Sequence, residues 1–382
     1  MRVIFDPSRG QRVPVFAWSS ALADDTARQL AHLASQPWVV DHVAAMADAH
    51  VSDGVSVGTV FATEHEVVPS ALGGDLGCGV RAVHLPLAAS SLDRRALEAI
   101  LSALTRRIPV GRDVHRAARD VPAALFEAPL STGALTHARE ALCRRHLGTL
   151  GAGNHFVELD RDAGGDLWLL VHSGSRGLGK VIADHHSRAA VASSPSAIAT
   201  LDTRTDAGRA WLDDVSWAVD FARANRDALA NEALDVIRAM TGVEADEVID
   251  VPHNFVARER HGERELIVHR KGATPADDGE RGIIPGSMAT ATYLVRGLGC
   301  ERSWRSCSHG AGRVMTRREA RERVDHRALD HKMRSVVYDR RRVRDLVEEA
   351  PEVYRDIREV LDDQRELIEP ELRMEPVMVL KG

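Results

Sequence analysis

Five histidines in this chain stand beside small or polar residues rather than inside apolar runs. They are His50, His155, His172, His253 and His309, out of 18 histidines in 382 residues. A histidine that only fills a core packs among apolar neighbours, whereas one in a polar loop can bind a metal or transfer a proton. The pattern indicates a chemical site assembled from several loops.

Asp75 and Cys78 lie three residues apart in a segment that contains four glycines. This spacing lets a carboxylate and a thiolate converge on one cation while the backbone turns tightly. With His155, His172 and His253 they supply five donors, too many for one tetrahedral site and enough for two metals if the thiolate bridges. Paired cations about 4 Å apart stabilise the oxygens of phosphoryl transfer. The donor types alone favour zinc, and the alternative role of Cys78 is a small buried side chain in a turn.

Three glycine-rich turns have the composition of phosphate-binding loops. Residues 310–313 lead into a helix that we expect to start at Thr316, and residues 285–288 and 173–177 form similar turns. Exposed backbone N–H groups and a helix N-terminus favour an anion, and Arg313 adds a positive charge. Beside a candidate dimetal site, these turns predict a nucleoside triphosphate or a polyphosphate ester as the ligand.

His309 immediately precedes the first of these turns. A histidine nitrogen can attack phosphorus and hold the group as a phosphoramidate, which passes it on readily. The alternative is that His309 only forms a hydrogen bond with a bound phosphate. The residue types alone leave both roles open.

A basic segment follows in the last third of the chain. Between Glu301 and Asp345 there are 14 Lys and Arg against seven Asp and Glu, in a chain whose formal net charge is −6. The segment is either one wall of an RNA groove or a solvated helix face of mixed charge. Aromatic residues make up only 4% of the chain, which favours contacts to the backbone and ends of RNA over extensive base stacking.

The bulk composition is that of a soluble globular protein. Apolar residues make up 44% of the chain and charged residues 28%. The N-terminus does not resemble a signal peptide, and no apolar run approaches the roughly 18 residues that span a bilayer. Four cysteines are too few for a disulfide scaffold in a chain of this length, so we expect free thiols in a reducing cytoplasm.

The elements that must position these residues are helices and short strands. Amphipathic spacing predicts helices over 90–108, after a serine cap, and over 209–240, ending at a glycine. A capping box at Thr316 predicts a third helix that continues with interruptions toward Val347. Apolar runs at 166–171 and 265–268 predict strands whose polar successors lie in loops. We expect an α+β or mixed α/β fold.

Taken in order, the motifs resemble the RtcB family of RNA ligases. They span nearly the whole chain and are specific as a set. The matching stretches are residues 46–50, 57–60, 74–79, 148–158, 172–177, 253–254, 269–274, 285–288, 308–313, 350–356 and 380–382.

The resemblance implies a single α+β domain over residues 1–382, with central β-sheets, flanking helices and a loop-borne dimetal site. Two Mn²⁺ ions per site would be the working metals. Asp75, Cys78 and His155 would hold one ion, and Cys78, His172 and His253 the other. The resemblance also implies that the enzyme consumes GTP and that its nucleophilic histidine, His309, carries GMP covalently.

Fourteen residues match the guanylate contacts of the family. They are Asn154, His155, Phe156, Glu158, His253, Asn254, Pro285, Gly286, Ser287, Met288, Gly310, Ala311, Gly312 and Lys381. Tyr354 and Thr292 are further candidates for the same pocket. Asp53 replaces a basic residue common in the family near the mouth of the site, which bears on substrate preference.

The implied reaction joins RNA 3′-phosphate or 2′,3′-cyclic phosphate ends to 5′-hydroxyl ends, in tRNA splicing or RNA repair. The cyclic phosphate opens, GMP passes from His309 to the 3′-phosphate, and the 5′-hydroxyl then displaces GMP. One alternative is an enzyme that caps 3′-phosphate ends with GMP without sealing them. The other is a non-catalytic protein that binds RNA ends. No membrane partner is implied, and the need for an accessory activator is left open.

Overall fold

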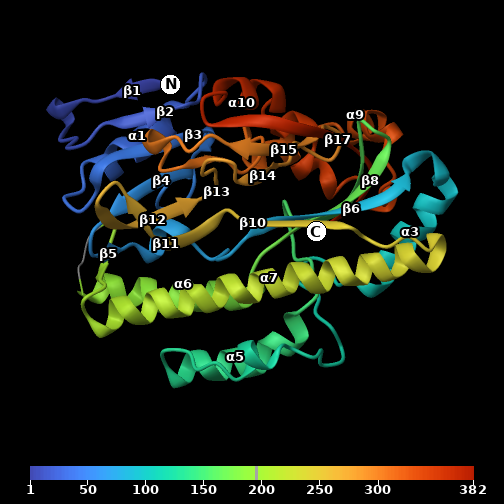
Figure 1. Cartoon of the computed structure of the whole chain (residues 1–382), viewed down its shortest axis with the longest axis horizontal. Coiled ribbons are helices and arrows are strands. Elements are labelled where there is room, and N and C mark those ends of the chain that lie inside the picture. Colours follow the sequence, from blue (N-terminus) through green and yellow to red (C-terminus); the bar gives the residue numbers. More distant parts are fainter. Residues whose placement is uncertain (194–196) are drawn as a thin grey trace.

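Two antiparallel-rich sheets form the centre of the computed structural model, which describes residues 1–193 and 197–382 (Figure 1). The seven-stranded sheet has the order β10 (Glu247–Pro252), β6 (Gly79–Ala88), β8 (Asp166–Ser173), β7 (Phe156–Asp162), β17 (Ile368–Lys381), β15 (Thr292–Gly297) and β14 (Arg281–Ile284). The six-stranded sheet has the order β1 (Arg2–Ile4), β2 (Val15–Ala17), β3 (Val40–His50), β4 (Val57–Thr63), β12 (Arg264–Lys271) and β11 (Asn254–His261). Two short ladders pair β13 (Ala273–Pro275) with β16 (Ser306–Ser308), and β5 (Glu66–Val67) with β9 (Leu201–Asp202).

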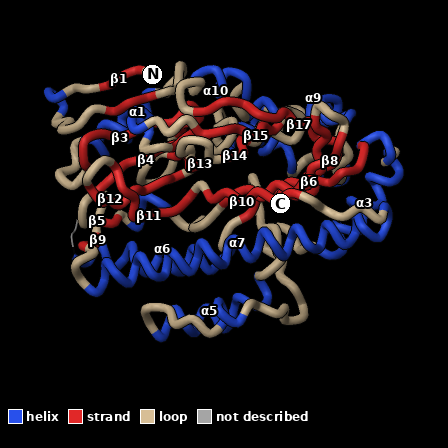
Figure 2. The backbone as a smooth tube through the Cα atoms, viewed as in Figure 1, coloured by secondary structure: helices blue, strands red, loops and turns tan. Residues whose placement is uncertain are grey.

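The helices flank these sheets (Figure 2). They are α1 (Asp24–Ala34), α2 (Pro69–Leu72), α3 (Arg94–Arg107), α4 (Ala123–Phe126), α5 (Gly133–His146), α6 (Arg176–Ser193), α7 (Asp206–Thr241), α8 (Arg317–Arg323), α9 (His326–Lys332) and α10 (Ile357–Asp363). Short 3₁₀ turns occur at Pro7–Arg9, Ala89–Ser91, Glu301–Ser303, Met333–Ser335, Arg340–Arg342, Leu346–Glu349 and Pro351–Val353. In the described part of the chain, none of the helices has the length and apolar character that a membrane span requires.

Apolar side chains cover both faces of the seven-stranded sheet. On one face, residues of β6, β7 and β8 pack against α3 and the second half of α7. On the other face, residues of the same strands pack against α8, α9 and the turns that follow them. The long helix α7 runs beneath both sheets, with α5 on its far side (Figure 1). The α+β class predicted from the sequence is confirmed.

The predicted helices are present, and two starts are shifted: α7, expected from residue 209, begins at Asp206. The helix expected at 90–108 begins at Arg94, because the Asp93 side chain rather than a serine caps it by accepting from Ala96 N–H. Helix α7 ends as predicted at Gly242, whose φ of 74° lies in the left-handed region that glycine tolerates. The capping box at Thr316 is formed, and the helical pattern after it breaks into α8, α9 and 3₁₀ turns.

The two predicted strands are longer than their apolar runs. Strand β8 continues through His172 and Ser173, and β12 continues through Lys271. The loop position predicted for His172 is therefore wrong. Its backbone pairs with Val80 on one side and with Phe156 on the other, so the ladder extends past the apolar run.

Candidate active site

The register of the strands aligns several candidate site residues at one end of the seven-stranded sheet. Gly79 pairs with Ser173 and with Pro252, and Phe156 pairs with His172 and Lys381. The residues just outside these pairs therefore lie at the same edge. They are Cys78, His155 and His253. Since His253 connects β10 to β11, this edge also meets the six-stranded sheet.

Cys78, His155 and His172 form a buried cluster with the geometry of a metal site. The Cys78 sulfur lies 3.5 Å from Nε2 of His155 and 3.2 Å from Nε2 of His172. Each Nδ1 faces a backbone carbonyl: His155 that of Leu150 at 2.9 Å, and His172 that of Asn154 at 3.2 Å. These contacts leave both Nε2 atoms directed at the thiol, as metal-binding histidines require.

The protonation of this cluster also suits a metal. Burial, followed by repulsion from Asp75, raises the pKa of Cys78 well above its ordinary value, so the free thiol stays protonated. Burial lowers the pKa of His172 and of His253 well below the usual value, so both imidazoles are neutral. A cation would displace the thiol proton and find neutral imidazole donors in place.

Asp75 and His253 extend the cluster in opposite directions. Asp75 Oδ2 lies 3.3 Å from Nε2 of His155. The ring of His253 lies 5.1 Å from that of His172 and 4.8 Å from that of His309. All five predicted ligands are thus neighbours, although His253 lies outside the tight group formed by Cys78, His155 and His172.

His309 lies next to His253 on the cavity side of this cluster, and Asp48 contacts the opposite side of its ring. Its Nδ1 lies 2.6 Å from Oδ2 of Asp48, and its backbone N–H donates to the same oxygen at 3.2 Å. The Asp48 side chain is fully buried on β3. Asp48 thus occupies the Nδ1 side of the ring, which leaves Nε2 as the ring nitrogen free to meet a ligand in the cavity.

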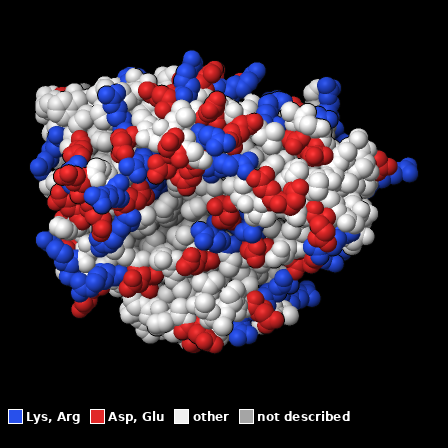
Figure 3. Space-filling model, viewed as in Figure 1, with Lys and Arg blue, Asp and Glu red and all other residues white. Residues whose placement is uncertain are grey.

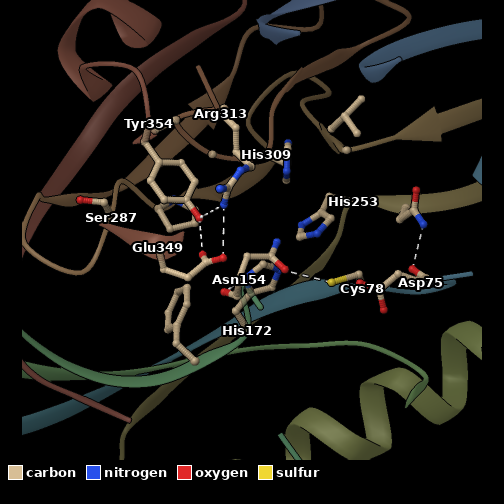
Figure 4. Close-up of a pocket in the computed structure, with 18 of the residues that line it drawn as sticks. Asp75, Cys78, Asn154, His172, His253, Ser287, His309, Arg313, Glu349 and Tyr354 are labelled. Atoms are coloured by element: carbon tan, nitrogen blue, oxygen red, sulfur yellow. Dashed lines mark hydrogen bonds and ion pairs between the residues drawn. The ribbon is translucent and has the colours of Figure 1, made fainter. Parts of the chain in front are cut away.

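A cavity of about 440 Å³ connects these groups, a volume that suits a small-molecule ligand. In Figure 4, Cys78, His172, His253 and His309 lie around its middle, with Tyr354 on one side and Asp75 on the other. Of the residues predicted to contact the guanylate, all but His155 line the cavity, and so do Tyr354 and Thr292.

Lys381 and Glu349 anchor an ion network in the wall of the cavity. Lys381 Nζ lies 3.5 Å from Glu349 and donates to the Asn154 carbonyl at 2.9 Å. Arg313 donates to Glu349 at 3.2 Å, and the Tyr354 hydroxyl donates to the same carboxylate. The positive charge predicted for phosphate binding at Arg313 is thus shared with a buried acid.

The three glycine-rich turns divide into two kinds. Residues 285–288 and 310–313 line the cavity. Residues 173–177 do not line it, although His172, which precedes them, does. From that turn, Arg176 reaches 3.1 Å from Nδ1 of His155. At the start of α8, the backbone N–H groups of Thr316 and Glu319 already donate within the capping box and are not free to bind an anion.

The basic segment is largely neutralised by neighbouring acids. Within it, ion pairs join Arg305 to Glu301 and Arg341 to Asp339. Further pairs join Arg318 to Glu322, Arg323 to Glu319 and Arg340 to Asp330. On the face shown in Figure 3, positive and negative side chains are interspersed. Of the two interpretations, the mixed-charge surface is the one that the contacts favour.

Sequence reasoning gave no role to several residues that support the site. Asp48 and Arg226 are the main ones, and both are completely buried. The sequence pattern could have identified both residues. Asp48 interrupts an apolar run in β3, and Arg226 lies on the apolar side of α7. A charged residue at a core position implies a specific partner.

Comparisons with known proteins identify the family of the chain. A family model described as tRNA-splicing ligase RtcB matches residues 29–140 and 128–382. The chain is 34% identical to the RNA-splicing ligase RtcB of Escherichia coli K12, over 97% of the chain and 98% of the relative. It is 29% identical to the RNA-splicing ligase RtcB of Mycobacterium tuberculosis, over 93% of the chain and all of the relative. The protein is thus an enzyme of the RNA ligase class. It belongs to the RtcB family.

Proposed function

We propose that this enzyme is a GTP- and Mn²⁺-dependent ligase that joins RNA 3′-phosphate or 2′,3′-cyclic phosphate ends to 5′-hydroxyl ends through a His309–GMP intermediate. The observation that carries the proposal is that His309 and the Cys78 cluster line the same nucleotide-sized cavity, with Asp48 beside Nδ1 of His309. Residues 1–382 would act as one catalytic domain, because the site draws on strands from both sheets.

In the first step, Nε2 of His309 attacks the α-phosphorus of GTP. A P–N bond forms as the bond to the bridging oxygen breaks, and pyrophosphate leaves with that oxygen's electron pair. The imidazole becomes a cation that keeps its Nδ1 proton. The Asp48 carboxylate at 2.6 Å stabilises that positive charge, as a carboxylate does for an active-site imidazolium.

The guanylate would occupy the side of the cavity that holds Asn154, Phe156, Glu158, Pro285 and Lys381. Loop amides near Gly310 and Gly312 would contact its phosphate, since glycine lets the backbone approach closely. At Gly312 a side chain could not fit, because a Cβ there would lie 2.4 Å from the Asp48 carbonyl oxygen.

The donor set fits two divalent cations. Asp75, Cys78 and His155 would hold one, and Cys78, His172 and His253 the other, with the thiolate shared. The support is the pair of sulfur–nitrogen contacts at 3.5 and 3.2 Å and the neutral state of His172 and His253. When bound, such ions supply charge stabilisation to the phosphoryl oxygens. Sulfur and imidazole also suit zinc, so the manganese assignment is the part that metal titration must test.

The remaining steps transfer and then expel GMP. Water opens a cyclic phosphate end, if present, to a 3′-phosphate. An oxygen of that phosphate attacks the His309-bound phosphorus, so the P–N bond breaks and a pyrophosphate-linked end forms. The 5′-hydroxyl of the second strand loses its proton as it attacks the 3′-phosphorus, and GMP leaves. Transfer of GMP to the 3′-phosphate gives the final displacement a good leaving group, which the phosphomonoester lacks.

The test begins with labelled nucleotide. Purified enzyme with Mn²⁺ and α-labelled GTP should retain acid-labile label after denaturation. His309→Ala should retain none, and His331→Ala, an exposed histidine on α9, should label normally. Chasing the adduct with a 3′-phosphate RNA and a 5′-hydroxyl RNA should then yield joined product.

Two outcomes would change the conclusion. Accumulation of a stable GMP-capped end with unjoined 5′-hydroxyl RNA would favour a capping enzyme. Absence of label with Mn²⁺, Zn²⁺ and Mg²⁺ alike, with or without cell extract as a source of an activator, would contradict the covalent mechanism.

A further inference from the structure

We infer that His50 is the general base of the joining step: its Nε2 accepts the proton of the 5′-hydroxyl as that oxygen attacks the capped 3′ end of the other strand. The inference rests on the proposed function, because it takes the GMP-capped RNA end as the substrate. Of the five histidines that stand beside small or polar residues in the sequence, His50 is the one to which the proposed mechanism gives no part.

His50 is the last residue of β3 and lines the same cavity as His309. Asp48, two residues earlier on the strand, contacts both imidazoles. Its carbonyl oxygen lies 2.9 Å from Nδ1 of His50, and its carboxylate lies 2.6 Å from Nδ1 of His309. One residue thus positions the nucleophilic histidine and a second histidine that is not among the candidate metal ligands.

The contact with Asp48 determines which nitrogen of His50 is free. A carbonyl oxygen can only accept a hydrogen bond, so Nδ1 of His50 carries the proton and Nε2 holds a lone pair. Nε2 forms no hydrogen bond with any residue in the described part of the chain. Burial lowers the pKa of His50, so the imidazole is neutral near neutral pH. A neutral imidazole with a free nitrogen is ready to accept a proton.

The backbone that carries His50 is firmly placed. His50 pairs with Val57 of β4, and the carbonyl of Ala49 accepts a hydrogen bond of 3.2 Å from Arg355. Gly58 follows Val57 with a φ of 76°, and a Cβ there would lie 2.7 Å from Cα of Ala49. The two strands therefore approach each other closely just before His50, which restricts where its ring can lie.

Other charged and titratable groups near His50 are less suited to act as the base. They are Asp48 on the same strand, Asp53 in the following loop, Lys271 at the end of β12, His309 after β16 and Arg355 before α10. Lys271 already donates to two backbone carbonyls of the loop that contains Asp53. Asp53 is exposed, and a solvated carboxylate is a weaker base than an imidazole.

The joining step is the one in which an RNA hydroxyl must lose a proton. When His309 attacks GTP, its nucleophilic nitrogen is already unprotonated, and the 3′-phosphate that takes up GMP is already ionised. In joining, the 5′-oxygen forms a bond to the 3′-phosphorus while its proton moves to Nε2 of His50. The bond from that phosphorus to the bridging oxygen breaks, and GMP leaves with the electron pair. The imidazolium then returns its proton to water, since His50 is only partly buried.

The experiment uses RNA that already carries GMP on its 3′-phosphate, so that joining is measured apart from the earlier steps. Single-turnover joining of this RNA to a 5′-hydroxyl strand is compared for the wild type, His50→Ala and His50→Asn. Asparagine keeps an N–H donor for the Asp48 carbonyl but cannot act as a base. Adduct formation with labelled GTP and metal content are measured on the same proteins. His32→Ala, an exposed histidine on α1, is the matched control.

We expect both His50 variants to join capped RNA more slowly by about 10²-fold or more, the range for a lost general base. Their metal content and their rate of adduct formation should match those of the wild type and of His32→Ala. Added imidazole should restore part of the joining rate of His50→Ala, because it can supply the missing base.

Three results would overturn the inference. The first is normal joining by both variants. The second is an equal slowing of adduct formation and of joining, because His50 would then act through Asp48 on His309. The third is a loss of joining that imidazole does not restore, which would make His50 a positioning residue.

Failure of the proposed function gives a different pattern in the wild type. If the wild type forms no adduct with GTP but joins capped RNA, the covalent step fails, and the joining rates of the variants still decide the role of His50. If the wild type does not join even capped RNA, the proposed ligation fails, and the inference fails with it.

Discussion

The guanidinium of Arg226 donates a hydrogen bond of 2.8 Å to the carbonyl of Gly77, the residue before Cys78. The same group donates at 3.1 Å to the carbonyl of Ser173, the residue after His172, and it forms a salt bridge with Asp250 at 2.6 Å. One fully buried side chain on α7 thus connects the segment that carries Cys78 with the segment that carries His172, two members of the candidate metal site.

Replacing Arg226 should therefore damage both stability and metal binding. Loss of one member of a buried ion pair costs about 3–5 kcal/mol when the partner is left unpaired. Because Arg81 still lies 3.3 Å from Asp250, we expect the free energy of unfolding of Arg226→Met to fall by no more than that amount and the bound metal to decrease. Denaturant titration and elemental analysis measure the two effects. Arg223→Met is the matched control, because Arg223 is exposed and lies 3.9 Å from the same acid; an equal loss there would contradict the assignment.

Asp48→Asn should slow adduct formation while leaving nucleotide affinity nearly unchanged. The amide keeps the shape of the carboxylate but cannot balance the positive charge that develops on His309. We expect single-turnover formation of the GMP adduct to slow by about 10²–10⁴-fold, as for other carboxylate-assisted histidines. Asp24→Asn, in the exposed first turn of α1, should label at the wild-type rate. Normal labelling by Asp48→Asn would remove Asp48 from the mechanism.

Cys78→Ala should cost more metal and more sealing activity than Asp75→Ala. The thiol contacts both His155 and His172, whereas Asp75 contacts only His155 of the pair. We expect metal affinity to fall by about tenfold or more for Cys78→Ala, since even supporting residues contribute that much. Metal content after dialysis and the sealing rate are the readouts. Equal and mild losses in the two variants would rule out a bridging thiolate.

Lys381→Met should raise the KM for GTP without reducing metal content. Its ammonium contacts the Asn154 carbonyl and Glu349 at the cavity wall, and we expect an effect on the order of tenfold, as for a lost charge-assisted hydrogen bond. Lys332→Met is the control, because Lys332 forms a comparable 3.0 Å ion pair with Glu352 away from the cavity. Guanylylation that is insensitive to Lys381→Met would exclude the proposed contact.

The contacts of His261 with Glu259 and Glu301 predict how the stability of the fold depends on pH. Hydrogen bonding with Glu259, followed by that with Glu301, raises the pKa of His261. A raised histidine pKa stabilises the fold below the unfolded value of about 6.5, and the benefit is lost as pH rises through the folded pKa. The stability difference between wild type and His261→Gln should thus be larger at pH 6 than at pH 8, by at most about 1 kcal/mol because solvent screens the exposed Glu301. Urea titration at both pH values tests this; a difference that does not change with pH would contradict it.

Local features were the most predictable part of the fold. The end of α7 at Gly242 and the capping box at Thr316 depend on residues close in sequence. The predicted start of α3 was wrong, because Asp93 offered a better cap than the serines before it. The loop predicted around His172 was also wrong, because cross-strand pairing, which periodicity does not report, extends β8.

Residues of the site could be predicted from the sequence only where they lie in a recognisable motif, and the contacts between distant residues could not. The five metal-ligand candidates came from their types and contexts, and the structure brings them together. Asp48 and His309 are 261 residues apart, and nothing in the local pattern of either residue specifies their contact. The sequence likewise did not show which acidic residues form ion pairs with the arginines of the basic segment, so its net charge in the folded protein could not be predicted.

Strand β17 has a further consequence for how the enzyme is made. It pairs with β7 and β15 in the seven-stranded sheet, and it ends at Lys381 in the cavity wall. Domains fold while they are synthesised, beginning with their N-terminal parts. Here the candidate metal ligands and His309 are all synthesised before the strand that completes their sheet. A nascent chain therefore cannot complete the wall of this pocket until residue 381 has been translated.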